Sequence, residues 1–445
     1  MGTTSRRHSG EKGARRLHER SVLAEQCASL IKLRNGISST VMSISGQAPL
    51  SRNRNFVLVW AGQSLSMFGS RLTYISLMWW VLEETGSASA LAGVAIAAAL
   101  PVLFFGPLAG VFVDRLDRRR LMLAMDLANG VIIGTAAALL MIGVLQVWEI
   151  YLFTILASTA TVFHRPALQS SIPNLVSQGE LMRANGLYQL SAGAAGITGP
   201  AVGGILVGML GSGDTMLLDA GTFLLAAVSL ALASFPSPRI EVKKGLGAII
   251  SDLAVGLRFL RDSRILFFML ILFALINFIL APTSILFPIM AKDVLHAGAR
   301  GFGLFGSALS LGMVIGGLFT SRAKRGRHRG LLIIGGLALL GVTLAVFGLS
   351  RNMSLSLAAL GIVGFSVALV NVTEAVIFQT RVPNDLQGRV FAAQSAVTDG
   401  LQPISLAATG AILTLLAAPT IVVACGVAAA LGGLGALFMR GMRQL

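Results

Sequence analysis

The sequence predicts an all-α membrane protein whose transmembrane helices form two similar six-helix bundles. Mean hydropathy over the 445 residues is +0.79, with 55% apolar and 12% charged residues. A water-soluble globular domain does not sustain this composition over such a length, so a lipid bilayer is the expected solvent. Twelve apolar windows follow one another along the chain, and two of the loops between them recur in the second half. Together these features predict a duplicated membrane fold.

Each apolar window is long enough to cross a hydrocarbon core about 30 Å thick, which takes roughly 20 residues of helix. The windows are approximately 55–82, 90–113, 121–145, 148–172, 184–210, 214–235, 265–290, 301–320, 330–349, 355–380, 390–416 and 419–438. We number them as spans 1 to 12. The order predicts six helices in each half.

The distribution of basic residues predicts the orientation of these spans. Of the 35 Lys and Arg residues, ten lie before span 1 and 21 lie in loops or the tail on that same side. The opposite loops carry only Lys292, Arg300 and Arg351, and Arg71 lies inside span 1. Basic loops stay in the cytoplasm, so both termini should be cytoplasmic. The net charge of +16 therefore reflects topology, and we expect no nucleic-acid partner.

The same pattern divides the chain into four segments. Residues 1–54 form a basic cytoplasmic tail that we expect to be poorly ordered, and 55–235 form the first bundle. Residues 236–264 form a basic cytoplasmic linker with an amphipathic interfacial helix near 249–260. Residues 265–445 form the second bundle and a short tail. The only cysteines, Cys27 and Cys425, provide no disulfide framework and no metal site.

Two loops are repeated between the halves. Gly110-Val-Phe-Val-Asp114-Arg115-Leu-Asp-Arg118-Arg119 follows span 2, and Gly317-Leu-Phe-Thr-Ser321-Arg322 follows span 8. Gln169-Ser-Ser-Ile-Pro-Asn after span 4 likewise matches Gln379-Thr-Arg-Val-Pro-Asn after span 10. Duplicated halves are typical of secondary transporters. The first loop resembles the loop motif of the major facilitator superfamily, with Phe112 and Asp117 in place of its Leu and second Gly.

That resemblance implies a gating role for the loop, because in the family it holds the two halves together in one conformation. The gating residues would be Gly110, Asp114, Arg115, Arg118 and Arg119, with Asp126 joining Asp114 and Arg118 from one turn inside span 3. The second copy has Ser321 in place of the acid. A charge network is therefore expected only in the first half.

Span 5 carries a second motif. Ala195-x-x-x-Gly199-Pro200-x-x-Gly203-Gly204 is similar to the motif of drug:proton antiporters, with Ala for its first Gly. More narrowly, Trp60-Ala-Gly-Gln63, Phe163-His164-x-Pro166 and Gly388-Arg389-Val-Phe look like the Mef-type macrolide exporters and the enterobactin-exporter-like group. The likeness extends over roughly 55–438. Small residues on spans 2, 5, 8 and 11 would permit the close, sliding contact that these helices make in the family.

The candidate substrate site follows from residues that are costly to place in a membrane. An ionisable group at mid-bilayer costs about 3 kcal/mol on insertion scales, so each one suggests a function. In the family, spans 1, 4, 7 and 10 line the central cavity. We therefore expect substrate contacts from Gln63, Met67, Arg71, Tyr74, Asn277, Asn371, Glu374 and Phe378. The alternative for the methionines of span 1 is ordinary packing.

Glu374 is the first candidate for proton coupling. Low-dielectric surroundings disfavour a charged carboxylate, so such a group can bind and release protons in the working range. The alternative is a structural ion pair with Arg71. Asp399 is either a second proton site or a hydrogen-bonded packing residue. Asp219 is a third candidate, with a cap or interfacial contact as its alternative.

These features predict a proton-coupled exporter of hydrophobic or amphipathic, drug-like or macrolide-like molecules that works by alternating access. A siderophore or metabolite exporter of the same fold is the alternative, followed by a lipid flippase or a non-transporting sensor. The sequence has no Walker loop and no nucleophile with a base, so we expect neither an enzyme nor a cofactor. The expected partners are a small-molecule substrate, protons and the lipid bilayer. We expect a monomer in a bacterial-type inner (plasma) membrane.

Overall fold

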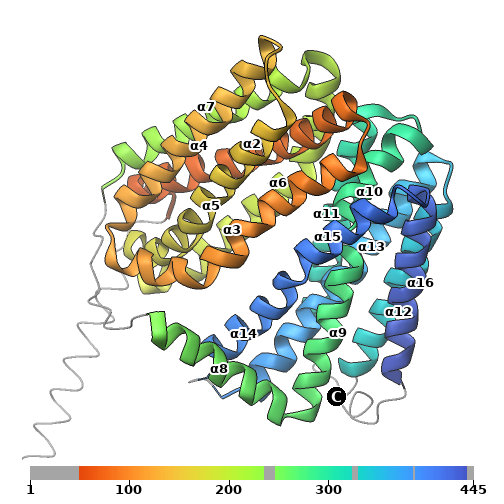
Figure 1. Ribbon diagram of the computed structural model, residues 1–445. Coiled ribbons are helices and arrows are strands. Elements are labelled where there is room, and N and C mark those ends of the chain that lie inside the picture. Colours follow the sequence, from red (N-terminus) through yellow and green to blue (C-terminus); the bar gives the residue numbers. More distant parts are fainter. Residues whose placement is uncertain (1–49, 235–245, 323–328, 384–385, 438–445) are drawn as a thin grey trace, which may run out of the picture.

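The computed structural model describes residues 50–234, 246–322, 329–383 and 386–437, and these residues contain helices and no strand. The predicted all-α fold is confirmed. Figure 1 shows two groups of long helices, one from each half of the chain. The expected basic tail before residue 50 lies outside the described residues.

The first half consists of six long helices, and the second half repeats the pattern with two interruptions. The first six are α2 (Arg54–Thr85), α3 (Ala88–Arg115), α4 (Arg118–Met141), α5 (Val147–Leu175), α6 (Leu181–Leu210) and α7 (Ser212–Leu232), with short 3-10 turns at Leu50–Arg52 and Gln178–Glu180. The linker helix is α8 (Leu246–Asp262). Then follow α9 (Arg264–Leu280), α10 (Thr283–Ile289), the π-helix η3 (Met290–Val294), α11 (Gly298–Arg322), α12 (Arg329–Leu349), α13 (Met353–Arg381), α14 (Gln387–Gly400), α15 (Gln402–Ile412) and α16 (Ala418–Leu437).

Ten of the twelve predicted windows coincide with helical segments long and apolar enough to span a bilayer. The window at 55–82 lies within α2, whose charges lower its hydropathy, and the window at 390–416 is divided between α14 and α15. Pro282 and Pro403 follow the two breaks of the second half. Proline lacks the N–H that an uninterrupted helix requires, which explains why spans 7 and 11 are each built from shorter pieces.

Polar caps fix where several helices begin. Asn53 Oδ1 accepts a 3.1 Å hydrogen bond from Phe56 N at the start of α2. Asp117 Oδ1 accepts from Arg120 N at 3.0 Å at the start of α4. Gly86, with a φ of 58°, ends α2 in the left-handed region that favours glycine. The Asp117 that departs from the family motif therefore serves as a helix N-cap.

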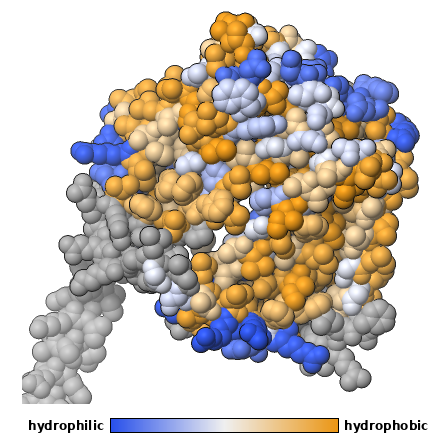
Figure 2. Space-filling view, viewed as in Figure 1, coloured by the Kyte–Doolittle hydropathy of each residue, from blue (hydrophilic) through white to orange (hydrophobic). Residues whose placement is uncertain are grey.

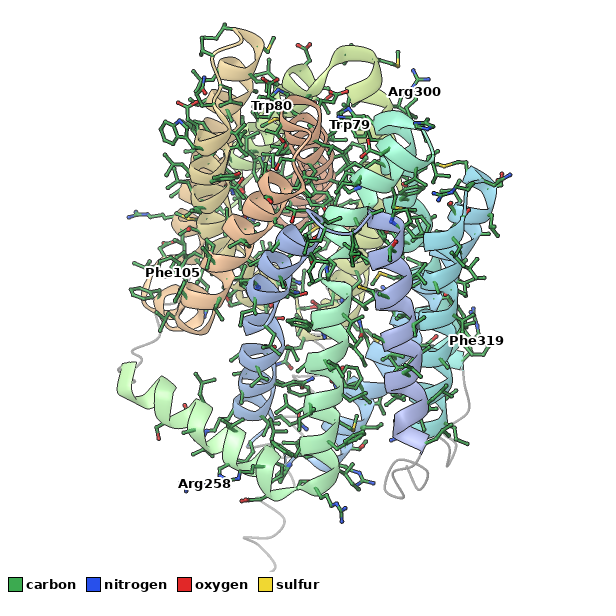
Figure 3. All side chains as sticks on the ribbon, turned by 45° about the vertical axis from the view of Figure 1, so that its right-hand side comes forward. Trp79, Trp80, Phe105, Arg258, Arg300 and Phe319 are labelled. Carbon is green, nitrogen blue, oxygen red and sulfur yellow. The ribbon has the colours of Figure 1, made fainter. Side chains whose placement is uncertain are left out.

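The two halves meet near one end of the molecule. α6 packs on α11 and α3 packs on α15, and Figure 1 shows the bundles diverging away from these contacts. We call the end where α2 finishes and α3 begins the closed end, and the opposite end, which carries the loop between α3 and α4, the open end. Trp79, Trp80 and Arg300 lie near the closed end (Figure 3).

The outer surface is apolar between two polar ends. Figure 2 shows hydrophobic residues over the sides of both bundles and hydrophilic residues at the top and bottom of the view. Large side chains such as Leu190, Met209 and Leu431 are exposed on the surface. A soluble monomer rarely exposes so much contiguous apolar surface, so this belt fits a lipid environment.

Candidate substrate and coupling site

Arg71 projects from the middle of α2 and is exposed. The glycine at 199 on α6 makes room for it, because a Cβ there would lie 2.7 Å from the Arg71 Cβ. One turn further along α2, Tyr74 is 42% exposed and its ring centre lies 6.2 Å from that of Phe302 on α11. Arg71 and Tyr74 thus stand beside the contact between the halves, as a substrate site would require.

Gln63 and Asp126 belong to a different cluster, inside the first bundle. Gln63 is only 2% exposed, and its Nε2 donates to Asp126 Oδ2 at 2.8 Å. His164 Nε2 lies 3.2 Å from the other oxygen, Asp126 Oδ1. Asp126 therefore joins α2, α4 and α5 instead of reaching the loop with Arg118. Gln63 has a buried structural partner and does not share the exposed position of Arg71.

Glu374 lies in α13, about two turns before its open end, and is 9% exposed. Its Oε1 accepts a 2.5 Å hydrogen bond from Gln394 Nε2 on α14. Among the described residues, Glu374 and Arg71 form no ion pair, so the structural alternative left open by the sequence does not hold in this conformation. A buried acid held by one neutral donor has no fixed counter-charge.

The remaining predicted substrate residues are divided between surface and core. Asn371 is exposed and Asn277 is partly buried, with its Nδ2 donating to Phe273 O at 2.9 Å. Phe378 is completely buried and lies 6.0 Å from the Phe391 ring in the core of the second bundle. Met67 packs at the edge of a core cluster. The expectation that Phe378 faces the substrate is wrong for this conformation, because the side chain fills the core.

Asp219 on α7 is another buried acid. It is 0% exposed and lies about two turns inside the helix, so it is not the interfacial contact that the sequence left open. Its Oδ2 accepts from Thr73 Oγ1 at 2.6 Å and its Oδ1 from Thr222 Oγ1 at 2.9 Å. The third candidate, Asp399, is partly buried near the end of α14.

The gating-loop arginines bond within their own half. Arg119 Nε donates to Leu230 O at 2.9 Å and its Nη2 to Ala231 O at 2.7 Å, at the end of α7. Arg118 Nη1 donates to Ser170 O at 2.9 Å in the last turns of α5. Guanidinium groups at helix C-termini stabilise the exposed carbonyls. Gly110 lies in open space, and the side chains of Asp114 and Arg115 lie outside the described residues.

The antiporter-like motif lies in the contact between α6 and α11. A Cβ on Gly204 would collide with Ala299 O of α11, and Gly203 faces Leu72 and Ile75 of α2. Pro200 lies directly against Gly303 and Gly306 of α11. Close packing through small residues, as expected, therefore holds for spans 5 and 8. It does not hold at Gly106 and Gly110 of span 2, where a Cβ on either glycine would have no neighbour within 4 Å.

Sequence reasoning missed three polar residues that the fold brings to the acids. Gln394 binds Glu374, Thr73 binds Asp219, and Asn129 lines the same cavity as Asp219. Each is uncharged, so the high cost of placing an ionisable group in the membrane did not identify it. Thr73 lies between Arg71 and Tyr74 in the sequence, and this proximity was the one signal that could have identified a member of the set.

Comparison with known proteins agrees with this geometry. Residues 44–443 match the family described as transmembrane secretion effector, MFS_3. Macrolide efflux protein A of Streptococcus pyogenes is 28% identical over 79% of this chain and 87% of its own length. The multidrug efflux pump Tap of Mycolicibacterium fortuitum is 27% identical over 85% and 93%. The crystal structure of the nucleoside transporter NupG superposes with a TM-score of 0.70 at 12% identity, covering 88% of this chain and all of that one. The predicted resemblance is confirmed, and the chain belongs to the transmembrane secretion effector family of the major facilitator superfamily.

Proposed function

We propose that this transporter exports hydrophobic or amphipathic small molecules in exchange for protons, by alternating access. Its relatives named as macrolide and multidrug efflux proteins support the substrate class. The arrangement of the halves supports the mechanism, because they pack at the closed end and diverge at the open end. If the basic loops are cytoplasmic, the open end faces the cytoplasm and this state receives substrate from inside.

The single observation that carries the coupling proposal is the environment of Glu374. The carboxyl is nearly buried, receives one hydrogen bond from the neutral Gln394 and has no cation within 4 Å in the described part of the chain. An isolated buried charge is unfavourable, so the group gains from binding a proton when it is enclosed. When water reaches the Glu374 carboxyl, the charged form is no longer unfavourable and the group can release the proton. Alternate enclosure and hydration would couple proton binding to the movement of the halves.

Arg71 and Tyr74 are the proposed substrate contacts on the opposite bundle. Both are exposed, Tyr74 lies beside Phe302 of α11, and Gly199 of α6 makes room for Arg71. Asp399 would provide a secondary proton site on α14, the helix that also carries Gln394. We further propose that the protein acts as a monomer in the plasma membrane.

The test is transport by purified protein in liposomes with an acidic lumen. Labelled erythromycin should accumulate in the lumen as lumenal pH rises, since outward protons exchange for drug. We expect Glu374→Gln to slow pH-driven accumulation at least about tenfold, in line with loss of a proton-transfer group. Drug-for-drug exchange without a pH gradient should persist, because it requires movement of the halves but no net proton transfer.

Glu83→Gln is the matched control, because it makes the same chemical change at an exposed acid, near the end of α2 in the other bundle. It should transport like the wild type. Full pH-driven accumulation by Glu374→Gln would refute the coupling role. Absence of any macrolide movement by the wild type would refute the substrate class.

A further inference from the structure

A cavity of about 230 Å³ lies inside the first bundle. It is lined by α2, α3, α4, α5 and α7, and Ser284 of α10 lies at one edge. Most of its wall is apolar, with Leu77, Ile133, Phe153 and Phe223 among the lining side chains. Drug-sized ligands usually occupy about 300–1,000 Å³, so this cavity has room for one end of such a molecule.

Asp219 lies in the wall of this cavity. The Asp219 carboxylate accepts one hydrogen bond at each oxygen, from Thr73 and Thr222. A carboxylate has about four acceptor positions, so both oxygens retain capacity for a further donor. Of the described residues, none places a cation within 4 Å of Asp219. The negative charge is therefore uncompensated by the protein.

Two more acceptors in the same wall have no partner. Asn129 on α4 is 2% exposed, and its Oδ1 makes no hydrogen bond. Thr154 Oγ1 on α5 is also buried without a partner. Leaving such a group unpaired costs about 1–3 kcal/mol, and native proteins tolerate it where a ligand or water completes the bonding. Three helices thus bring unfilled acceptors to one apolar cavity.

We propose that this cavity is a subsite for the protonated amine end of an amphipathic substrate. This inference rests on the proposed export function. The ammonium would lie against Asp219 and donate to the free acceptors of Asn129 and Thr154, while the adjoining carbons contact the apolar wall. The rest of the molecule would extend past Tyr74 and Ser284, which border the cavity on the side of the second half.

A proton bound to Asp219 accounts for fewer features of the cavity than an ammonium group does. Protonation would neutralise Asp219, but it would fill no volume and would leave Asn129 and Thr154 unpaired. A neutral apolar ligand would fill the volume but leave the carboxylate without a counter-charge. Only a group that is cationic, donates several hydrogen bonds and carries hydrocarbon meets all three features.

The test compares two fluorescent probes that differ in one charge, dansylcadaverine and its N-acetyl derivative. Binding to the purified full-length protein in detergent is measured by fluorescence titration. We expect the wild type to bind the amine at least about tenfold more tightly, and Asp219→Asn to remove this preference, as for truncation of a buried charge pair. Binding of the neutral probe should be unchanged in Asp219→Asn.

Two further variants separate this inference from its alternatives. Ala157→Phe fills the cavity from α5 and leaves Asp219 itself unchanged, and it should weaken amine binding to a similar degree. If Asp219→Asn does not fold, amine binding by Ala157→Phe tests the proposed subsite in its place. Glu83→Gln, which changes an exposed acid near the end of α2, should bind the amine like the wild type. The titration needs no pH gradient, so failure of the coupling proposal remains distinguishable from failure of this one.

Three outcomes would overturn the subsite. One is equal wild-type affinity for both probes. Another is wild-type amine affinity in both Asp219→Asn and Ala157→Phe. The third is an equal loss of both probes in Asp219→Asn, which would assign the acid to structure instead of to the ligand's charge.

Discussion

The closed and open ends of the molecule are built from different kinds of contact. At the closed end, backbone approaches backbone: Gly303 lies against Pro200 O and Gly204 lies against Ala299 O. Lys292 adds one side-chain bond between the halves, with its Nζ donating to Leu82 O at 2.9 Å. At the open end, Arg118 and Arg119 bind helix termini of their own half.

This difference shows how each end can respond to substitution. Contacts between backbones tolerate no added atom, so the closed end depends on glycine itself. The open-end arginines hold exposed carbonyls that another donor or water can satisfy. The two buried acids without a cationic neighbour in the described residues follow the same division, since Asp219 lies toward the closed end and Glu374 toward the open end. Each half therefore has a buried carboxyl without a cationic partner among the described residues, and the two lie toward opposite ends of the molecule.

The largest effect should come from Gly303→Val. The new Cβ would collide with the Pro200 carbonyl, and overpacking of this kind costs about 1–3 kcal/mol. That cost falls on the closed state alone, so the balance between states should shift by about 5- to 150-fold. Spin labels on Glu83→Cys and Leu415→Cys, exposed in opposite halves, should report a longer distance across the closed end.

Gly106→Val is the matched control, because no atom lies within 4 Å of a Cβ at that position. It should leave the distance and the transport rate near their wild-type values. If both glycine variants open the closed end equally, helix propensity and not the contact with α11 is responsible.

Arg119→Ala should have an intermediate effect, on stability more than on transport. The substitution removes two charge-assisted hydrogen bonds to the end of α7 and should cost about 1–2 kcal/mol. Thermal unfolding in detergent measures this loss. Arg120→Ala is the comparison, since that side chain is exposed and forms no hydrogen bond with the described residues. Unchanged stability with impaired transport would instead favour a latch between the halves.

Much of the fold was predictable because hydropathy and repeated loops depend on local sequence. Windows such as 330–349 coincide with a helix, α12 (Arg329–Leu349), to within one residue. The breaks near Pro282 and Pro403 were absent from the prediction, since an apolar window does not reveal which proline interrupts a span. The close contact of Gly204 with α11 followed from the antiporter-like motif.

The candidate site was harder to predict, because helix periodicity assigns a residue to a face but not the neighbour of that face. Gln63 and Tyr74 were both expected to contact substrate, yet Gln63 binds Asp126 and Tyr74 borders the cavity. Arg71 and Glu374 were paired by charge alone, and the partner of Glu374 is Gln394. Pairings across bundles depend on tertiary packing and conformation, which one sequence does not contain.

The smallest effect should come from Lys292→Met at the closed end. Its ammonium binds Leu82 O in the last turn of α2, where a cation stabilises the helix terminus by about 0.3–1 kcal/mol. Loss of this bond should shift the balance toward opening by no more than about fivefold, since 1 kcal/mol corresponds to that factor. The same spin-label pair measures the shift, and Lys292→Arg should restore most of it because the charge is kept. A shift as large as that of Gly303→Val would mean that the hydrogen bond from Lys292 to Leu82 O stabilises the closed end as much as the glycine contact does. The closed and open ends would then differ in the strength of their side-chain contacts and not in the kind of contact.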